Sequence, residues 1–244
     1  MPGKLSIILP TLNEGENLKV LIPRIHKIIK KGYEIIIVDD DSKDNTEKII
    51  KNLKRKKFPI KFIQRKREKG LSSAVIRGIK ESKGKVILVM DADLSHPPEI
   101  IPEMIKYINK GYDMVVASRF LKDSYVEQWK FYRKLVSLIG VLVAKPLVNV
   151  TDPLAGFFAF KRKIISDIDI LNPIGFKILL EILVKYNVKN IKEIPYTFYP
   201  RFKGESKADV HIYLQYYLHI LKLYFFKLKN FIKRLTGKWE KKEY

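Results

Sequence analysis

Two aspartates one residue apart, Asp91 and Asp93, directly follow an apolar run that begins at Val86. Alternate residues of an extended chain point to the same side, so both carboxylates are expected on one face where this strand ends. Two close carboxylates repel each other unless a cation neutralises them, and oxygen ligands of this kind suit Mg²⁺ or Mn²⁺. The same residues could instead form a turn that caps the helix announced by Pro97 and Pro98. The rest of the chain has to separate these two interpretations.

The composition restricts the classes of partner. The 244 residues carry a net charge of +22, which predicts an anionic partner: nucleic acid, an acidic membrane surface or a phosphorylated substrate. The chain has no cysteine, which excludes disulfides, a thiolate nucleophile and a cysteine-based zinc site. No charge-free apolar run reaches the length of about 18 residues that a membrane span needs, and the apolar run at the N-terminus is too short for a signal peptide. A chain of this length is expected to form one domain with a short appendage.

Strand and helix patterns alternate along the first half of the chain. Near-continuous β-branched runs are typical of strands buried in a parallel sheet, and their alternation with helical patterns predicts an α/β domain with a doubly wound, mostly parallel sheet flanked by helices. The expected strands are Leu5–Pro10, Glu34–Asp39, Ile60–Gln64, Val86–Met90 and Met114–Ser118. The expected helices are Asn17–Lys31, Asp44–Lys56, Leu71–Lys83 and Pro98–Asn109.

Polar residues recur where the predicted strands end. In such sheets ligands bind at the carboxyl ends of the strands, and burying several carboxylates there without a ligand would be costly. These repeated strand endings therefore favour a binding site over a simple turn at Asp91. They are Pro10–Glu14, Asp39–Ser42, Asp91–Asp93 and Ser118–Arg119.

Four motifs in order resemble family 2 glycosyltransferases of the GT-A fold: PTLNE at 10–14, VDDDS at 38–42, KGLSSA at 69–74 and DADLSHPPE at 91–99. Within that family the chain is most similar to dolichyl-phosphate (polyprenyl-phosphate) mannosyltransferases. That similarity rests on three later segments, Arg133…Ser137, Asp152…Phe157 and Arg201…Lys207. The resemblance implies a GT-A (Rossmann-like) fold over residues 1–207.

The resemblance also implies a role for each matching position. Asp91, Asp93 and Arg119 are the implied catalytic residues, and Ser95 is implied to join the two aspartates around Mg²⁺ or Mn²⁺. The acceptor phosphate is implied to contact Arg119, Arg133 and Ser137. Arg201 and Lys207 are implied to lie on a loop that closes over the donor diphosphate. The implied donor-binding residues are Pro10, Leu12, Glu14, Val38, Asp39, Asp41, Asp91, Ala92, Asp93, Ser95, Arg119, Arg201 and Lys207.

The activity implied by the resemblance is inverting transfer of mannose from GDP-mannose to dolichyl or polyprenyl phosphate, giving a lipid-linked mannose for glycan or glycoprotein synthesis. A metal held by the two aspartates would neutralise the leaving diphosphate as a Lewis acid. A phosphate monoester acceptor is already an anionic nucleophile, so no general base is required. Arginines can orient such a phosphate through bidentate hydrogen bonds. His96 is expected to fix the turn rather than to act as a base.

Three other functions compete with this one. A polyprenyl-phosphate glucosyltransferase that uses UDP-glucose would keep nearly every motif, and Leu12 stands where the family usually has a tyrosine in the base pocket. A nucleic-acid-binding protein would suit the charge, but the chain lacks a basic stripe with interleaved aromatic residues. A catalytically silent membrane scaffold would not need the paired aspartates or the arginines Arg119 and Arg133.

Two segments predict contact with a membrane surface. Residues 129–148, within the catalytic domain, and Val210–Leu235, within a C-terminal unit at 208–244, have apolar arcs wider than a soluble helix needs. Tyrosines and lysines in the second segment favour a membrane interface. We therefore expect a peripheral (monotopic) protein without a transmembrane span, on the cytoplasmic face of a membrane, where a separate membrane-anchoring subunit could assist. Ordinary packing of both helices onto the domain is the alternative.

Overall fold

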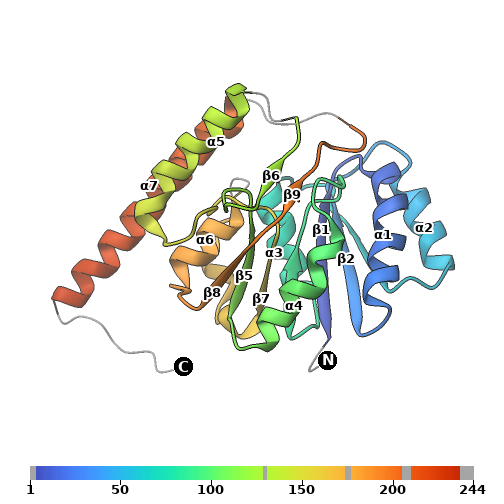
Figure 1. Cartoon of the computed structure of the whole chain (residues 1–244), viewed down its shortest axis with the longest axis horizontal. Coiled ribbons are helices and arrows are strands. Elements are labelled where there is room, and N and C mark those ends of the chain that lie inside the picture. The colour runs from blue at the N-terminus through green and yellow to red at the C-terminus, as the bar shows by residue number, and fades with distance from the viewer. Residues whose placement is uncertain (1–3, 129–130, 174–176, 205–209, 237–244) are drawn as a thin grey trace.

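A mixed sheet of seven strands forms the centre of the computed structural model, which describes residues 4–128, 131–173, 177–204 and 210–236 (Figure 1). The strand order is β3-β2-β1-β4-β7-β5-β8. All neighbouring strands are parallel except that β7 runs antiparallel to both β4 and β5. The strands are β1 (Leu5–Thr11), β2 (Tyr33–Asp39), β3 (Ile60–Gln64), β4 (Val86–Val89), β5 (Met114–Ser118), β7 (Phe158–Lys161) and β8 (Ile191–Pro195). A separate pair of parallel strands is formed by β6 (Tyr125–Val126) and β9 (Thr197–Phe198).

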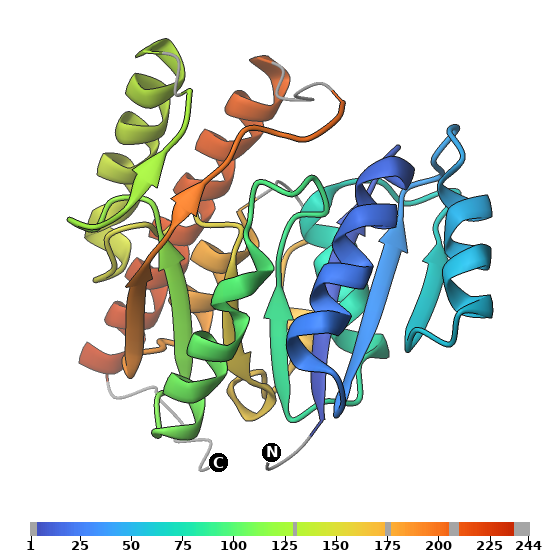
Figure 2. The ribbon, with the colours of Figure 1, turned by 45° about the vertical axis from the view of Figure 1, so that its right-hand side comes forward.

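Helices cover both faces of the sheet because successive strand residues point to opposite sides. On β1, Ile7 and Leu9 pack against α1, α2 and α4, whereas Ile8 packs against α3 and α6. The two layers of helices lie on either side of the sheet in Figures 1 and 2. The helices are α1 (Gly15–Ile29), α2 (Thr46–Arg55), α3 (Leu71–Glu81), α4 (Ile101–Asn109) and α6 (Ile178–Lys185), with short 3₁₀ turns at Pro98–Ile100, Lys145–Leu147, Arg162–Ile164 and Ile168–Ile170.

The predicted mostly parallel α/β sheet with flanking helices is confirmed. Two of the five predicted strands have the predicted bounds, and the other three differ by one residue at one end. The first helix begins at Gly15, two residues early, and ends at Ile29. It ends there because Lys30 and Gly32 take positive φ values of 60° and 77°, which a helix cannot continue through.

The sequence patterns predict no helix or strand between residues 149 and 207. The structure has β7, α6, β8 and β9 in this range. Strand β7 enters the sheet between β4 and β5, with Phe158 paired to both Val89 and Val116. Because β7 is antiparallel to these strands, its beginning lies at the edge where they end. The loop before β7, which holds Asp152 and Gly156, therefore reaches the carboxyl edge of the sheet.

Two long helices, α5 (Phe131–Ala144) and α7 (Val210–Leu235), lie side by side and extend away from the sheet (Figures 1 and 2). Helix α6 joins them to the domain, because Leu179 and Ile182 face the sheet while Leu180 and Val184 face α7. Two tyrosines of α7 donate hydrogen bonds to carbonyl oxygens of α5: Tyr216 to Gly140 (2.7 Å) and Tyr224 to Val143 (2.9 Å).

Each of these two helices also exposes an apolar stripe at helical spacing. The α7 stripe, whose side chains are between 49% and 71% exposed, consists of Leu218, Leu221, Phe225, Leu228, Ile232 and Leu235. The α5 stripe consists of Phe131, Leu135, Leu138 and Leu142. None of the helices in the described ranges is long and apolar enough to cross a membrane.

Candidate active site

The polar strand endings meet at one edge of the sheet, as the sequence predicts. Asp91 and Asp93 follow β4 at its carboxyl end, and Arg119 follows β5. In the strand order, β7 separates β4 from β5. The loop before β7 lies between Asp91 and Arg119, because its Asp152 pairs with Arg119 and its Gly156 lies beside Asp91. A Cβ built on Gly156 of this loop would lie 3.3 Å from Asp91 Oδ2, so a side chain there would crowd the carboxylate.

Asp93 is buried and held by short contacts. Its Oδ1 accepts hydrogen bonds from the backbone N–H (3.0 Å) and the hydroxyl (2.6 Å) of Ser95. Its Oδ2 forms an ion pair with Arg201 Nε at 3.2 Å. Asp91 is more open, with 33% of its side chain exposed. Burial raises the pKa of Asp91, and the charge of Asp93 contributes in the same direction although His96 opposes it. A bound cation would favour the ionised form of Asp91.

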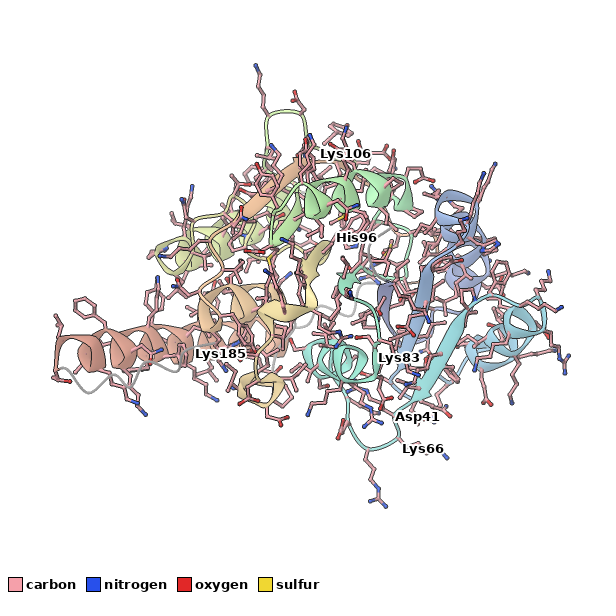
Figure 3. The ribbon with its side chains drawn as sticks, turned by 90° about the horizontal axis from the view of Figure 1, so that it is seen from below. Asp41, Lys66, Lys83, His96, Lys106 and Lys185 are labelled. Atoms are coloured by element: carbon pink, nitrogen blue, oxygen red, sulfur yellow. The ribbon has the colours of Figure 1, made fainter. Side chains whose placement is uncertain are left out.

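His96, labelled in Figure 3, is buried next to the aspartates and is only 2% exposed. The backbone N–H of Asp91 donates to its Nδ1 at 3.0 Å, and its ring stacks on Phe157 with 5.1 Å between centroids. Burial lowers the pKa of His96 despite the nearby carboxylates. A neutral ring whose Nδ1 already accepts a hydrogen bond must carry its proton on Nε2, so His96 positions Asp91 and offers no free basic nitrogen.

Arg119 is fixed by Asp152, a partner that sequence reasoning did not assign. Asp152 is fully buried and accepts hydrogen bonds from Arg119 Nε (2.7 Å) and Nη2 (2.9 Å). Burial alone would raise the pKa of Asp152, but Arg119 outweighs burial and holds it below the usual value. Glu193 on β8 in turn accepts hydrogen bonds from the backbone N–H (2.8 Å) and hydroxyl (2.6 Å) of Thr151, next to Asp152. The guanidinium of Arg119 is therefore held in one orientation.

Lys177 is a second cation at this site that the sequence analysis missed. Its Nζ donates to the carbonyl oxygen of Leu154 at 3.1 Å, in the same loop as Asp152. Burial lowers the pKa of Lys177 to about 8, and the nearby Arg119 adds to this effect while Asp152 and Asp91 oppose it. Lys177 precedes a short apolar helix, and nothing in the sequence distinguishes it from the many surface lysines.

The segment after β9 lies over the aspartates. The backbone N–H groups of Tyr199 and Phe202 donate to the carbonyl oxygens of Ser95 and Asp93, each at 3.1 Å. On α1, Asn17 Nδ2 donates to the carbonyl oxygen of Lys203 at 3.1 Å and to Glu14 Oε2 at 2.5 Å. Arg201 approaches Glu14 at 3.9 Å. The predicted donor residues Glu14, Asp93 and Arg201 are thus brought together, whereas Lys207 lies outside the described residues.

The acidic turn after β2 has two kinds of carboxylate. Asp39 is buried and accepts hydrogen bonds from the Ser42 N–H (2.9 Å) and hydroxyl (2.5 Å). Asp41 is at the surface with a φ of 61°, and its pKa is lowered by a hydrogen bond from Lys43. Asp41 lies near Lys66 at the same end of the molecule in Figure 3.

Further residues at this edge of the sheet belong to, or adjoin, the predicted donor-binding set. Asp40, which was not singled out, pairs with buried Arg65 and accepts a hydrogen bond from the Gly70 N–H at 2.8 Å. Val38 is wholly buried against α3, so only its backbone can face a ligand. Pro10 and Leu12 are half-buried at the end of β1, and Ala92 is buried between the two aspartates.

The predicted acceptor residues are only partly assembled in the described structure. Ser137 is half-buried on α5, and no hydrogen bond joins it to Arg119. Arg133 lies in the first turn of the same helix, but its side chain is outside the described part of the chain. The roles of Arg133 and Ser137 stay predictions.

The aspartate pair fits a divalent cation. Within the described ranges no group of three or more His, Cys, Asp or Glu side chains is arranged to hold a metal. Two carboxylates with an adjacent hydroxyl, Asp91, Asp93 and Ser95, suit an ion that takes its remaining ligands from a substrate diphosphate and water. Gly156 has no side chain to crowd the Asp91 carboxylate.

A mostly parallel α/β sheet with paired aspartates at the end of a central strand defines the GT-A class of fold. Residues 6–169 match the family model described as glycosyl transferase family 2, and the chain belongs to this family. It is 47% identical to the dolichol-phosphate mannosyltransferase of Pyrococcus furiosus, over 90% of this chain and 63% of that protein. It is 34% identical to the enzyme of the same name from Saccharomyces cerevisiae, over 91% of this chain and 87% of that protein.

Solved structures share the fold at lower sequence identity. Glucosyl-3-phosphoglycerate synthase from Mycobacterium tuberculosis superposes with a TM-score of 0.67 at 17% identity, covering 91% of this chain and 80% of that one. The mannosyltransferase PcManGT from Pyrobaculum calidifontis, solved with GDP-Man and Mn²⁺, gives 0.65 at 14% identity over 91% of this chain and 65% of that one. The chain spans 63% of the length of the Pyrococcus furiosus relative.

Proposed function

We propose that this chain transfers mannose from GDP-mannose to dolichyl or polyprenyl phosphate with inversion at the sugar carbon. The observation that carries the proposal is the meeting of the Asp91–Asp93 pair with the Arg119–Asp152 pair at one sheet edge. Two relatives that each align with about nine-tenths of this chain are named dolichol-phosphate mannosyltransferase, which supports mannose transfer to a dolichyl phosphate. One pair would hold the donor diphosphate and the other would face the acceptor phosphate.

On the donor side, Asp91, Asp93 and Ser95 would hold Mg²⁺ or Mn²⁺. When bound, the metal supplies Lewis-acid stabilisation of the leaving diphosphate. Arg201 contacts Asp93, which supports a role in adding positive charge near the donor diphosphate. PcManGT, with the same fold, holds GDP-Man together with Mn²⁺.

On the acceptor side, no general base is needed because a phosphate monoester brings its own anionic oxygen. His96 cannot supply one in its described geometry, since its Nδ1 accepts the Asp91 N–H. Arg119 retains donors that Asp152 does not use, because a guanidinium has five N–H groups in a rigid fork. Orientation of the phosphate by this fixed arginine would supply much of the rate.

A lipid-linked acceptor also accounts for α5 and α7. Their exposed apolar stripes and the exposed lysines of α7 suit the boundary between headgroups and acyl chains of an acidic membrane. We also propose peripheral attachment to the cytoplasmic face of a membrane, with or without a membrane-anchoring subunit. The alternative that both helices are ordinary core leaves ten apolar side chains of the two stripes exposed.

The deciding experiment measures transfer of radiolabelled sugar to a polyprenyl phosphate in detergent, from GDP-mannose or UDP-glucose, with Mg²⁺, Mn²⁺ or EDTA. We expect metal-dependent lipid labelling from GDP-mannose alone. Labelling from UDP-glucose would overturn the donor and keep the metal and arginine roles. Absence of any lipid product would reject the acceptor.

The Asp93→Asn variant should lose at least about a hundredfold in rate, whereas Asp123→Asn, at an exposed position, should keep full activity.

A further inference from the structure

Tyr196 lies between β8 and β9 with its ring fixed on three sides. Ring centroids lie 5.9 Å from His96, 6.0 Å from Phe157 and 6.3 Å from Phe198. The side chain is 5% exposed, and its carbonyl oxygen accepts a hydrogen bond from the Tyr125 N–H at 3.2 Å. The direction of the Tyr196 hydroxyl is therefore set by packing.

The Tyr196 hydroxyl has no hydrogen-bond partner in the part of the chain that the structure describes. Other tyrosine hydroxyls have one: that of Tyr33 meets His26 Nδ1 at 2.7 Å, and that of Tyr186 donates to the Asp167 carbonyl oxygen at 2.5 Å. A buried polar group without a partner is destabilising and is uncommon enough in native proteins to need an explanation.

The surroundings of this hydroxyl indicate which partner it lacks. Burial raises the pKa of Tyr196, so the hydroxyl keeps its proton and can donate. Arg119 belongs to the same cluster, because its guanidinium carbon lies 6.0 Å from the centroid of the Phe198 ring, which contacts the Tyr196 ring. Asp152 already accepts hydrogen bonds from the side chain and backbone of Arg119. The missing group is therefore an acceptor that Arg119 would also attract.

We propose that the Tyr196 hydroxyl is a further substrate-binding donor, which hydrogen-bonds an oxygen of the acceptor phosphate monoester beside Arg119. The inference rests on the proposed function, because it takes the acceptor to be a lipid phosphate. A neutral donor suits this place: it adds a hydrogen bond to the phosphate without adding another cation close to Arg119 and Lys177. The rigid ring means that little side-chain freedom is lost on binding.

The test is Tyr196→Phe, which removes only the hydroxyl, with Tyr33→Phe as the matched control. For Tyr196→Phe we expect kcat/KM for polyprenyl phosphate to fall about tenfold, the effect of one hydrogen bond to a charged group, while KM for GDP-mannose stays unchanged. Its thermal midpoint should not fall, because the hydroxyl has no partner to lose. Tyr33→Phe should lower the thermal midpoint and leave both kinetic constants unchanged.

Equilibrium binding separates this inference from the proposed function. Calorimetric titration with farnesyl phosphate should give an affinity about tenfold weaker for Tyr196→Phe than for the wild-type chain. If the wild type binds farnesyl phosphate but transfers no mannose, the proposed function fails while this comparison still decides the role of Tyr196. Equal affinities, no binding of farnesyl phosphate by the wild type, or a loss confined to GDP-mannose would each overturn the inference.

Discussion

At the scale of single residues, the candidate metal site depends on an absent side chain as well as on the two aspartates. Gly156 lies directly against Asp91 and His96, the residue that positions the Asp91 backbone. A side chain at position 156 would crowd the Asp91 carboxylate, one of the groups that would hold the cation. The carboxylates supply the ligands, and the glycine keeps them accessible.

We therefore expect Gly156→Ala to impair metal-dependent donor binding without unfolding the domain. The added Cβ would lie 3.2 Å from His96 Cε1 and 3.3 Å from Asp91 Oδ2, closer than ordinary van der Waals contact. Titration of GDP-mannose in the presence of Mn²⁺ should show an affinity weaker by about tenfold, or about 1.4 kcal/mol. Gly140→Ala is the control, because its Cβ would also meet an atom at 3.0 Å but at the contact between α5 and Leu154. Equal affinity for Gly156→Ala and the wild type would show that Asp91 does not need this space.

At the scale of elements, local patterns in the sequence predicted one half of the site and missed the other. Asp91 and Asp93 could be placed because a long apolar strand and an i, i+2 spacing are local signals. Arg119 could be placed for the same reason, but its partner Asp152 could not. Asp152 reaches Arg119 only because β7, four residues long, inserts antiparallel between β4 and β5, and the neighbours of a strand are set by the whole sheet.

Helix α6 was missed for a related reason. It has eight residues and is apolar nearly all round, since one side faces the sheet and another faces α7. Such a run lacks the one-sided pattern by which surface helices are recognised. Its acidic residue, Glu181, is fully buried and pairs with Lys185 at 2.5 Å and with His219 of α7 at 3.2 Å. His219 therefore lies inside the α6–α7 contact.

We expect Glu181→Ala to destabilise the protein far more than Glu47→Ala, although both glutamates pair with a lysine one helical turn later. Glu47 and Lys51 are exposed, and such a pair contributes about 0.3–0.5 kcal/mol. Removing Glu181 would leave His219 and Lys185 without their buried carboxylate, at a cost of about 3–5 kcal/mol. Urea unfolding at pH 7 measures both values, and similar losses in the two variants would contradict the structural role of Glu181.

The same variant gives a pH dependence. Burial opposes ionisation of Glu181, but hydrogen bonds from His219, Lys185 and the Asn172 N–H outweigh burial and hold its pKa below the usual value. A carboxyl whose pKa is lowered by folding stabilises the fold above its unfolded pKa, about 4.3 for glutamate. That stabilisation is lost as the pH falls through the folded value. The difference between wild type and Glu181→Ala should therefore shrink below about pH 4.

At the scale of the whole molecule, two surfaces differ in chemistry. The sheet and its helices bury their apolar residues on both faces, whereas α5 and α7 expose apolar stripes. The net charge of +22 makes the whole chain attractive to anionic surfaces. Apolar stripes on projecting helices, in a strongly basic protein, are what an interface with an acidic bilayer requires.

The α7 stripe is expected to control attachment to vesicles without controlling catalysis in detergent. Replacing Leu221, Phe225 and Leu228 with serine removes three exposed apolar side chains from one face of α7, so their loss should leave folding intact. The triple variant should no longer sediment with vesicles that contain anionic lipid, yet it should keep its rate with a micellar acceptor.

Ile170→Ser, at an exposed apolar residue of a 3₁₀ turn outside α5 and α7, should sediment like the wild type. Since lysines near an anionic bilayer contribute about 1 kcal/mol each, wild-type sedimentation should also weaken with salt. Unchanged sedimentation of the triple variant would mean that α7 is not the surface that meets the bilayer.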